Sequence, residues 1–157
     1  MELEYEQEAK LIEEMIAYAR LGHRVCLLGK GQSMWPLLVD GRDYIFLEAI
    51  KKDTELIRGD VVLYQVNGRY ILHRIYRVTE HGYEMLGDGN VMVEPPLARE
   101  NIFLKAVAYE RKGKRVLADA WYLQVYADIW MRIRRFRPWV RRGIRFLKGK
   151  ERKDCEN

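Results

Sequence analysis

Hydrophobic residues near the start of the chain recur at three- and four-residue spacing, which is the period of one helix face. The members of this face are Leu11, Ile12, Met15, Ile16 and Ala19. Glutamates gather early in the segment, where the helix dipole favours negative charge, and Gly22 is a natural stop. The pattern predicts an amphipathic helix over residues 3–20 that packs on or caps the elements that follow.

From Val25 onward the apolar residues fall into short runs, many of them β-branched or aromatic, that are separated by turn residues. Asn67-Gly68 is a strong hairpin signal, because both central positions of such a turn favour positive φ. The expected strands are 25–28, 43–50, 60–66, 69–79, 83–86, 102–111 and 114–117. This pattern predicts a mainly β fold, with an antiparallel, partly barrel-like core between an N-terminal helix and C-terminal helices.

Helical spacing returns over residues 118–137, and Pro138 should kink or end that helix because proline lacks an amide hydrogen. Arginines surround an apolar stripe there, and Trp130, Trp139 and Phe146 are candidate interfacial rings. The stripe consists of Ile129, Ile133, Phe136, Val140, Ile144 and Leu147. We therefore divide the chain into an N-terminal amphipathic helix (1–22), a β domain (23–118) and a basic amphipathic helical segment (119–157).

The distribution of charge and the number of cysteines indicate the cellular compartment that we expect for the protein. The formal net charge of +5 is uneven, since the first fifteen residues hold six glutamates whereas residues 132–150 are strongly basic. Cys155 lies in a polar tail, so a structural disulfide with Cys26 is not expected and a reducing compartment is favoured. The acidic N-terminus does not match a signal peptide, and no apolar run approaches the ~20 residues of a membrane span. We expect a cytoplasmic protein that is at most peripheral at a membrane.

The basic C-terminal segment has three interpretations. Its apolar stripe could pack on the sheet or on a partner, leaving the arginines in water. Alternatively, the segment could lie on an anionic membrane surface, with rings and stripe in the interface and arginines at the headgroups. Nucleic acid is the least favoured partner.

Ser33 is the first candidate for chemistry, because it lies in the constrained stretch Gly31-Gln32-Ser33-Met34-Trp35-Pro36. A serine hydroxyl needs a neighbouring base and oxyanion donors to act as a nucleophile, and otherwise this stretch is an ordinary loop. His73 is the candidate base: strand alternation places it between Ile71 and Ile75, and partial desolvation there favours the neutral imidazole. The alternative is a core histidine that bonds to a backbone carbonyl.

Asp88, in Gly87-Asp88-Gly89-Asn90, could orient the imidazole as the third member of a serine–base–carboxylate arrangement. By itself this stretch is also typical of an ordinary tight turn. Zinc-ligand spacing, a calcium loop and a phosphate-binding loop are all lacking, so we expect no metal and no cofactor.

Taken in order, these motifs resemble the S24/S26 serine peptidases, the group of the type I signal peptidases and the self-cleaving repressor domains. The resemblance spans roughly residues 25–117, and its specificity lies in the order and spacing of the motifs. They are Gly-x-Ser-Met-x-Pro-Leu (31–37), Gly-Arg-Asp (41–43), Arg-Gly-Asp-Val-Val (58–62), Ile-Leu-His-Arg-Ile (71–75), Gly-Asp-Gly-Asn (87–90) and Leu-Lys-Ala-Val-Ala-Tyr (104–109).

The resemblance implies a β-rich catalytic core with Ser33 as nucleophile. Bacterial-type members have a lysine base at the position of His73, whereas His-Arg-Ile is similar to the archaeal and endoplasmic-reticulum signal peptidases. Those enzymes carry a further carboxylate beyond the aspartate motif, and here only Glu94 could supply it. The supporting acid is therefore either Asp88 or Glu94.

The chain also departs from the family pattern. We expect no transmembrane anchor like that of signal peptidases, and Gly31 stands where many bacterial members carry a serine that acts as an oxyanion donor. Backbone amides near Ser33, helped by Gln32, would then hold the oxyanion. Self-cleavage is disfavoured, since no Ala-Gly or Cys-Gly bond precedes Ser33.

The leading hypothesis is a signal-peptidase-like serine endopeptidase that cleaves a leader or precursor peptide, with Ser33 as nucleophile and His73 as general base. The alternative is a catalytically inactive peptide-binding module that keeps the same fold.

Overall fold

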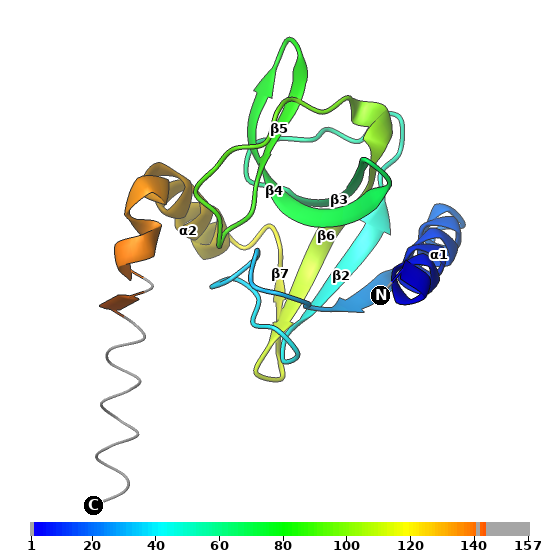
Figure 1. Cartoon of the computed structure of the whole chain (residues 1–157), viewed down its shortest axis with the longest axis horizontal. Helices are drawn as coiled ribbons and strands as arrows, with labels where there is room; N and C mark the ends of the chain where they lie inside the picture. The colour runs from blue at the N-terminus through cyan, green and yellow to red at the C-terminus, as the bar shows by residue number, and fades with distance from the viewer. Residues whose placement is uncertain (1, 141, 144–157) are drawn as a thin grey trace, which may run out of the picture.

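The computed structural model describes residues 2–140 and 142–143, and Figure 1 shows their arrangement. Within this part, helix α1 (Glu2–Arg20) precedes the strands, and helix α2 (Trp121–Arg132) follows them. The strands are β1 (Val25–Leu28), β2 (Tyr44–Ala49), β3 (Val61–Val66), β4 (Arg69–Thr79), β5 (Gly82–Leu86), β6 (Ile102–Arg111) and β7 (Lys114–Leu117). The short 3-10 helices η1 (Arg99–Asn101) and η2 (Arg134–Phe136) complete the set. The predicted N-terminal helix and the seven strands are confirmed, several strands to the residue.

All strand pairs are antiparallel, and the sheet order is β1-β2-β6-β3-β4-β5, with β7 paired to β6. The sheet curves strongly at β3 and β4 (Figure 1). In the described part of the chain its end strands β1 and β5 do not pair, so the barrel stays open. This confirms the mainly β, partly barrel-like fold.

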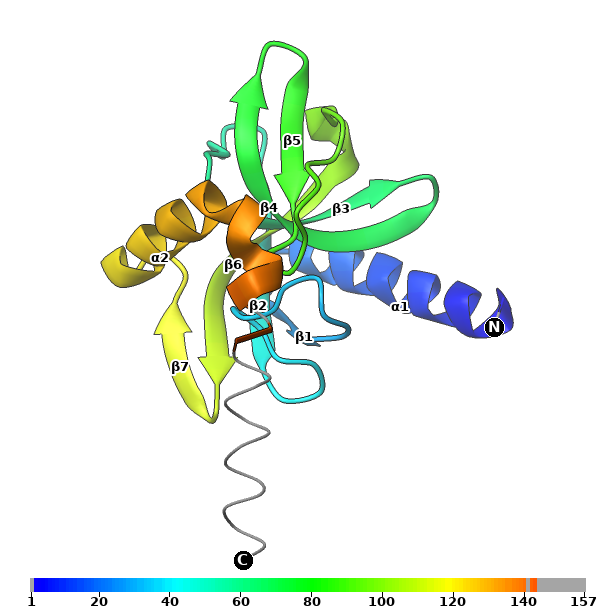
Figure 2. The same cartoon turned by 60° about the vertical axis from the view of Figure 1, so that its left-hand side comes forward.

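The sheet has an apolar core on each face, as the alternation of β3 shows. Val61 and Leu63 join one core, which α1 covers with Ile16 and Ala19. Val62 and Tyr64 point into a second, smaller core that β4 and β5 complete. Helices α1 and α2 lie on opposite sides of the strands (Figures 1 and 2).

The C-terminal helix differs from the sequence prediction. It ends at Arg132 and continues through η2, so the break precedes Pro138. Pro138 lies instead in the first turn of the helical residues 137–140, where a missing amide hydrogen costs little. No helix of the described residues is long and apolar enough to cross a membrane.

The predicted apolar stripe is not the buried face of the C-terminal segment. Ile129 and Phe136 are exposed, whereas the buried face consists of Leu123, Ala127, Trp130 and Met131. Trp130 is therefore a buried side chain and not an interfacial ring, because the helix is rotated to bring it against the 87–91 loop. Ile144, Phe146 and Leu147 lie outside the described residues.

Candidate active site

Ser33 lies on the turn that follows β1, and the turn is anchored on both sides. Next to it, Met34 inserts into the core that α1 covers. Gly29 donates its amide to the Asp43 carbonyl (2.8 Å), and the buried Asp43 carboxylate accepts from the Val39 amide (2.9 Å). Hydrogen bonds from Arg42 lower the pKa of Asp43 and keep it ionised. The sequence thus forms a rigid turn that leaves Ser33 half-buried at the surface.

His73 is held on β4 opposite Val62 of β3 and is only 5% exposed. Its Nδ1 lies 2.6 Å from Oε1 of Glu94 and 3.0 Å from the Tyr64 hydroxyl. That hydroxyl also donates to Oε2 of Glu94 (2.5 Å). The three side chains form a closed polar cluster at the edge of the smaller core.

The cluster determines which imidazole nitrogen carries the proton. An ionised carboxylate can only accept hydrogen bonds, so Nδ1 of His73 must be the donor to Glu94. In the neutral imidazole Nε2 then keeps its lone pair. Burial alone would raise the pKa of Glu94, but hydrogen bonds from His73 and Tyr64 lower it below the ordinary value. Glu94 is therefore an anion at neutral pH.

Tyr64 is a member of the cluster that the sequence analysis missed. Its ring is fully buried, and a buried tyrosine hydroxyl normally has a hydrogen-bond partner. The available signal was its position on the strand that precedes the Asn67-Gly68 hairpin, since a tight hairpin pairs Tyr64 with Ile71 and so places it on the face of His73. Burial and the bond to Glu94 raise the pKa of Tyr64, so its hydroxyl stays protonated.

Gly87 marks the point where His73 meets the Ser33 turn. A Cβ atom placed on Gly87 would lie 2.8 Å from His73 Nε2 and 2.6 Å from the Ser33 carbonyl oxygen. Both atoms therefore border Gly87, which places His73 Nε2 beside the turn that carries Ser33. Among the described residues no hydrogen bond joins the Ser33 hydroxyl to Nε2, and such contacts are commonly long without substrate.

Backbone groups of the turn could serve as oxyanion donors. The amide of Ser33 donates no hydrogen bond to any other described residue, so it is available to donate to the oxyanion of a substrate. Gln32, the other predicted contributor, is exposed, and its carbonyl accepts from the Trp35 amide at 3.2 Å.

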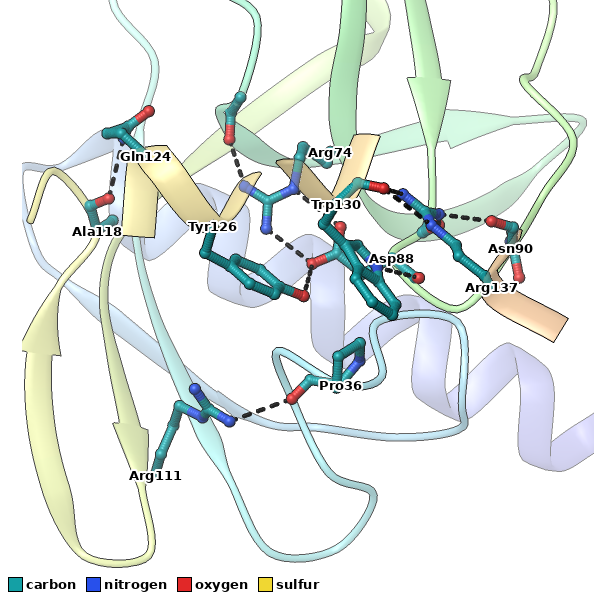
Figure 3. Close-up of polar contacts among 12 residues, drawn as sticks. Pro36, Arg74, Asp88, Asn90, Arg111, Ala118, Gln124, Tyr126, Trp130 and Arg137 are labelled. Carbon is teal, nitrogen blue, oxygen red and sulfur yellow. Dashed lines mark hydrogen bonds and ion pairs between the residues drawn. The ribbon is translucent and has the colours of Figure 1, made fainter. Parts of the chain in front are cut away.

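Asp88 lies apart from the His73 cluster. Its carboxylate accepts two hydrogen bonds from Arg74 (2.9 and 2.8 Å) and one from Tyr126 (3.1 Å), as Figure 3 shows. Both members of the ion pair are almost fully buried. The sequence allowed either Asp88 or Glu94 beside the imidazole, and the structure brings Glu94 there while Asp88 binds Arg74.

A largely apolar groove of about 550 Å³ opens beside Ser33. One wall is α1, which contributes Leu11 and Ile12, and another is the end of β1 with the loop after it. The strand β4 lines the groove with Tyr70, Ile71 and Leu72, before its pairing with β5 begins at Arg74. An extended chain in this groove would lie between backbone edges of β1 and β4.

Acidic, histidine and cysteine side chains in the described residues form no group of three or more that could hold a metal ion. The site brings together a half-buried serine, a histidine that is hydrogen-bonded to a carboxylate, and a backbone amide near that serine. These are the groups that acyl transfer requires.

A search of curated proteins gives no significant match. A family model described as peptidase S24-like matches residues 1–107. The match includes Ser33, His73 and Glu94, and it ends within β6, before α2. Because it covers more than half of the chain, the protein belongs to the peptidase S24-like family.

Proposed function

We propose that this protein is a serine endopeptidase of signal-peptidase type, with Ser33 as nucleophile and His73 as general base. The observation that supports the proposal is the Glu94–His73 pair, together with the position of Nε2 next to Gly87, which also borders the Ser33 carbonyl. A buried histidine that merely filled the core would not need an anionic partner.

In the proposed reaction, Ser33 Oγ attacks the substrate carbonyl carbon and its proton passes to His73 Nε2. Glu94 stabilises the resulting imidazolium through Nδ1–H, and the Ser33 amide donates to the oxyanion. Nε2–H then protonates the leaving amine as the C–N bond breaks. Water, deprotonated by His73, hydrolyses the acyl-enzyme and regenerates the serine.

The groove beside Ser33 fits an extended leader or precursor peptide. Peptides commonly bind β scaffolds by adding a strand to a sheet edge, and β1 and β4 both line this groove. Its walls include Ile12, Met34 and Ile45, so apolar side chains are the preferred occupants next to the cleaved bond.

A second candidate is a peptide-binding module with the same fold and no catalysis. The observation that favours it is that no hydrogen bond links the Ser33 hydroxyl to His73 within the described residues. Such a module would bind extended peptides in the same groove without cleaving them.

We also propose an anionic membrane surface as a partner. The outer face of α2 exposes Trp121, Tyr122, Val125 and Ile129, which are large apolar or aromatic side chains. Residues 129–150 contain nine Arg and Lys and no Asp or Glu. Exposed rings beside basic charge are typical of interfacial helices.

The test of the proposed function is digestion of a diverse peptide library by the wild type and by Ser33→Ala, with cut sites identified by mass spectrometry. We expect cuts after apolar-rich extended segments with the wild type and none with the variant. Binding of library peptides without any cut would favour the peptide-binding module.

A further inference from the structure

The polypeptide beyond the family match packs against the loop that lies between His73 and Ser33. This loop, residues 87–91, contains Gly87 next to Nε2 of His73 and donates the Gly89 amide to the Ser33 carbonyl (2.7 Å). The loop therefore contacts both the candidate base and the backbone of the candidate nucleophile.

Four side chains of the C-terminal segment hold the other side of this loop; we name Tyr126, Trp130, Arg134 and Arg137 the C-terminal clamp. Trp130 donates its indole N–H to the Asp88 carbonyl (2.7 Å), and Arg134 donates to the Val91 carbonyl (2.9 Å). Tyr126 donates to the Asp88 carboxylate (3.1 Å). Figure 3 shows Tyr126, Trp130 and Arg137 converging on the loop.

Arg137 is the centre of the clamp. It is 1% exposed, and its guanidinium donates to the carbonyls of Gly87 (2.8 Å) and Asn90 (2.5 Å). It also donates to the Trp130 carbonyl near the end of α2 (2.9 Å). The planar, multivalent donor thus ties the loop to the helix, which a lysine with a single ammonium could not reproduce.

These contacts satisfy the carbonyls of Gly87, Asp88, Asn90 and Val91 from outside the loop. A buried cation and a buried indole are costly unless they make such bonds, so their placement is specific to this loop conformation. The substrate groove lies elsewhere, and none of the clamp residues lines it.

We infer that the C-terminal clamp positions the 87–91 loop, and through it the relation of His73 to Ser33, so that Trp130 and Arg137 are positioning residues of the active site. This inference rests on the proposed function for its catalytic consequence. The mechanical part, that the segment holds the loop, does not depend on it.

Two conservative variants test the clamp in the full chain. Trp130→Phe removes the indole donor but keeps a ring, and Arg137→Lys keeps the charge but loses the multiple donors. The matched controls are Trp139→Phe and Arg135→Lys, whose wild-type side chains are exposed. Each protein is measured by hydrogen exchange with mass spectrometry and by peptide cleavage kinetics.

We expect faster exchange in peptides covering residues 87–91 and 32–35 of both clamp variants, and unchanged exchange in β2 and β6. With a cleaved substrate, kcat should fall by about tenfold to a hundredfold at unchanged KM, since a displacement of about 1 Å can cost on the order of a hundredfold. Both controls should match the wild type.

Unchanged exchange in the 87–91 loop would overturn the clamp, and faster exchange with an unchanged kcat would overturn the role of Trp130 and Arg137 as positioning residues of the active site. If the wild type cleaves nothing, the proposed function fails. The exchange data would then still decide whether the C-terminal segment holds the loop.

Discussion

Glu94 and Asp88 are the two carboxylates that the sequence motifs offer as partners of His73, but the structure gives them different neighbours. Glu94 is partly exposed and contacts the His73 ring, whereas Asp88 is fully buried in a bidentate ion pair with Arg74. Orienting an imidazole and neutralising a buried arginine are different tasks. The two residues should therefore respond differently to the loss of charge.

Glu94→Gln should reduce activity, and Asp88→Asn should reduce stability. We expect Glu94→Gln to lower kcat by about 10²- to 10⁴-fold with a near-wild-type fold, because the amide can no longer stabilise the imidazolium.

Asp88→Asn should lower the free energy of unfolding by about 3–5 kcal/mol, since it leaves Arg74 buried without its counter-charge. Cleavage kinetics and denaturant unfolding measure the two effects, and the reverse pattern would contradict the assignment.

The lowered pKa of Glu94 predicts a pH dependence of stability. A carboxyl group whose pKa is lower in the folded than in the unfolded chain contributes stability above its unfolded pKa, about 4.3, and loses it as pH falls through the folded pKa. Its neighbours His73 and Tyr64 are retained in Glu94→Gln, which cannot titrate at that position. The difference in unfolding free energy between the wild type and Glu94→Gln should shrink from about pH 5 to about pH 3. A difference in unfolding free energy that stays constant over this pH range would contradict the lowered pKa of Glu94.

At the scale of elements, the 87–91 loop needs a glycine next to the base. A methyl group on Gly87 would meet the Ser33 carbonyl, His73 Nε2 and the Asn90 amide at 2.6–2.8 Å. Gly87→Ala should therefore displace the loop and lower kcat by about tenfold or more. Gly143→Ala is the control, because its added methyl group meets no described atom within 4 Å. Equal kcat values for Gly87→Ala and the wild type would show that the 87–91 loop does not set the relative positions of His73 and Ser33.

The strands could be predicted from the sequence because their signals are local. Alternation in 69–79 and the Asn67-Gly68 turn give the face and the register of His73 without reference to the rest of the chain. The choice between Asp88 and Glu94 could not be made this way, because it depends on Arg74, which points to the opposite face of β4. The burial of Trp130 and Arg137 depends on contacts over more than forty residues, so the helical pattern alone misassigned the buried face.

At the scale of the whole molecule, the two faces of α2 have different surroundings. The inner face packs on the 87–91 loop, and the outer face exposes rings and aliphatic side chains next to arginines. If the outer face binds an anionic bilayer, attraction of roughly 1 kcal/mol per basic residue adds to burial of the apolar side chains.

Vesicle flotation tests this partner. We expect the wild type to float with anionic phosphatidylglycerol vesicles at low salt, and less with phosphatidylcholine or at high salt, because salt screens the attraction. Trp121→Ser with Ile129→Ser should weaken flotation, whereas Val78→Ser, at an exposed position on β4, should not. Absence of flotation at low salt would contradict the membrane proposal.

The central claim is that Ser33, activated by His73, cleaves peptides. Its most direct test is the cleavage rate of the library peptide that the wild type cuts fastest, measured for wild type and Ser33→Ala in parallel. We predict a loss of at least about a thousandfold in Ser33→Ala, as expected when a nucleophile is removed and binding is retained. Cleavage by Ser33→Ala at the wild-type rate and at the same bond would contradict the account.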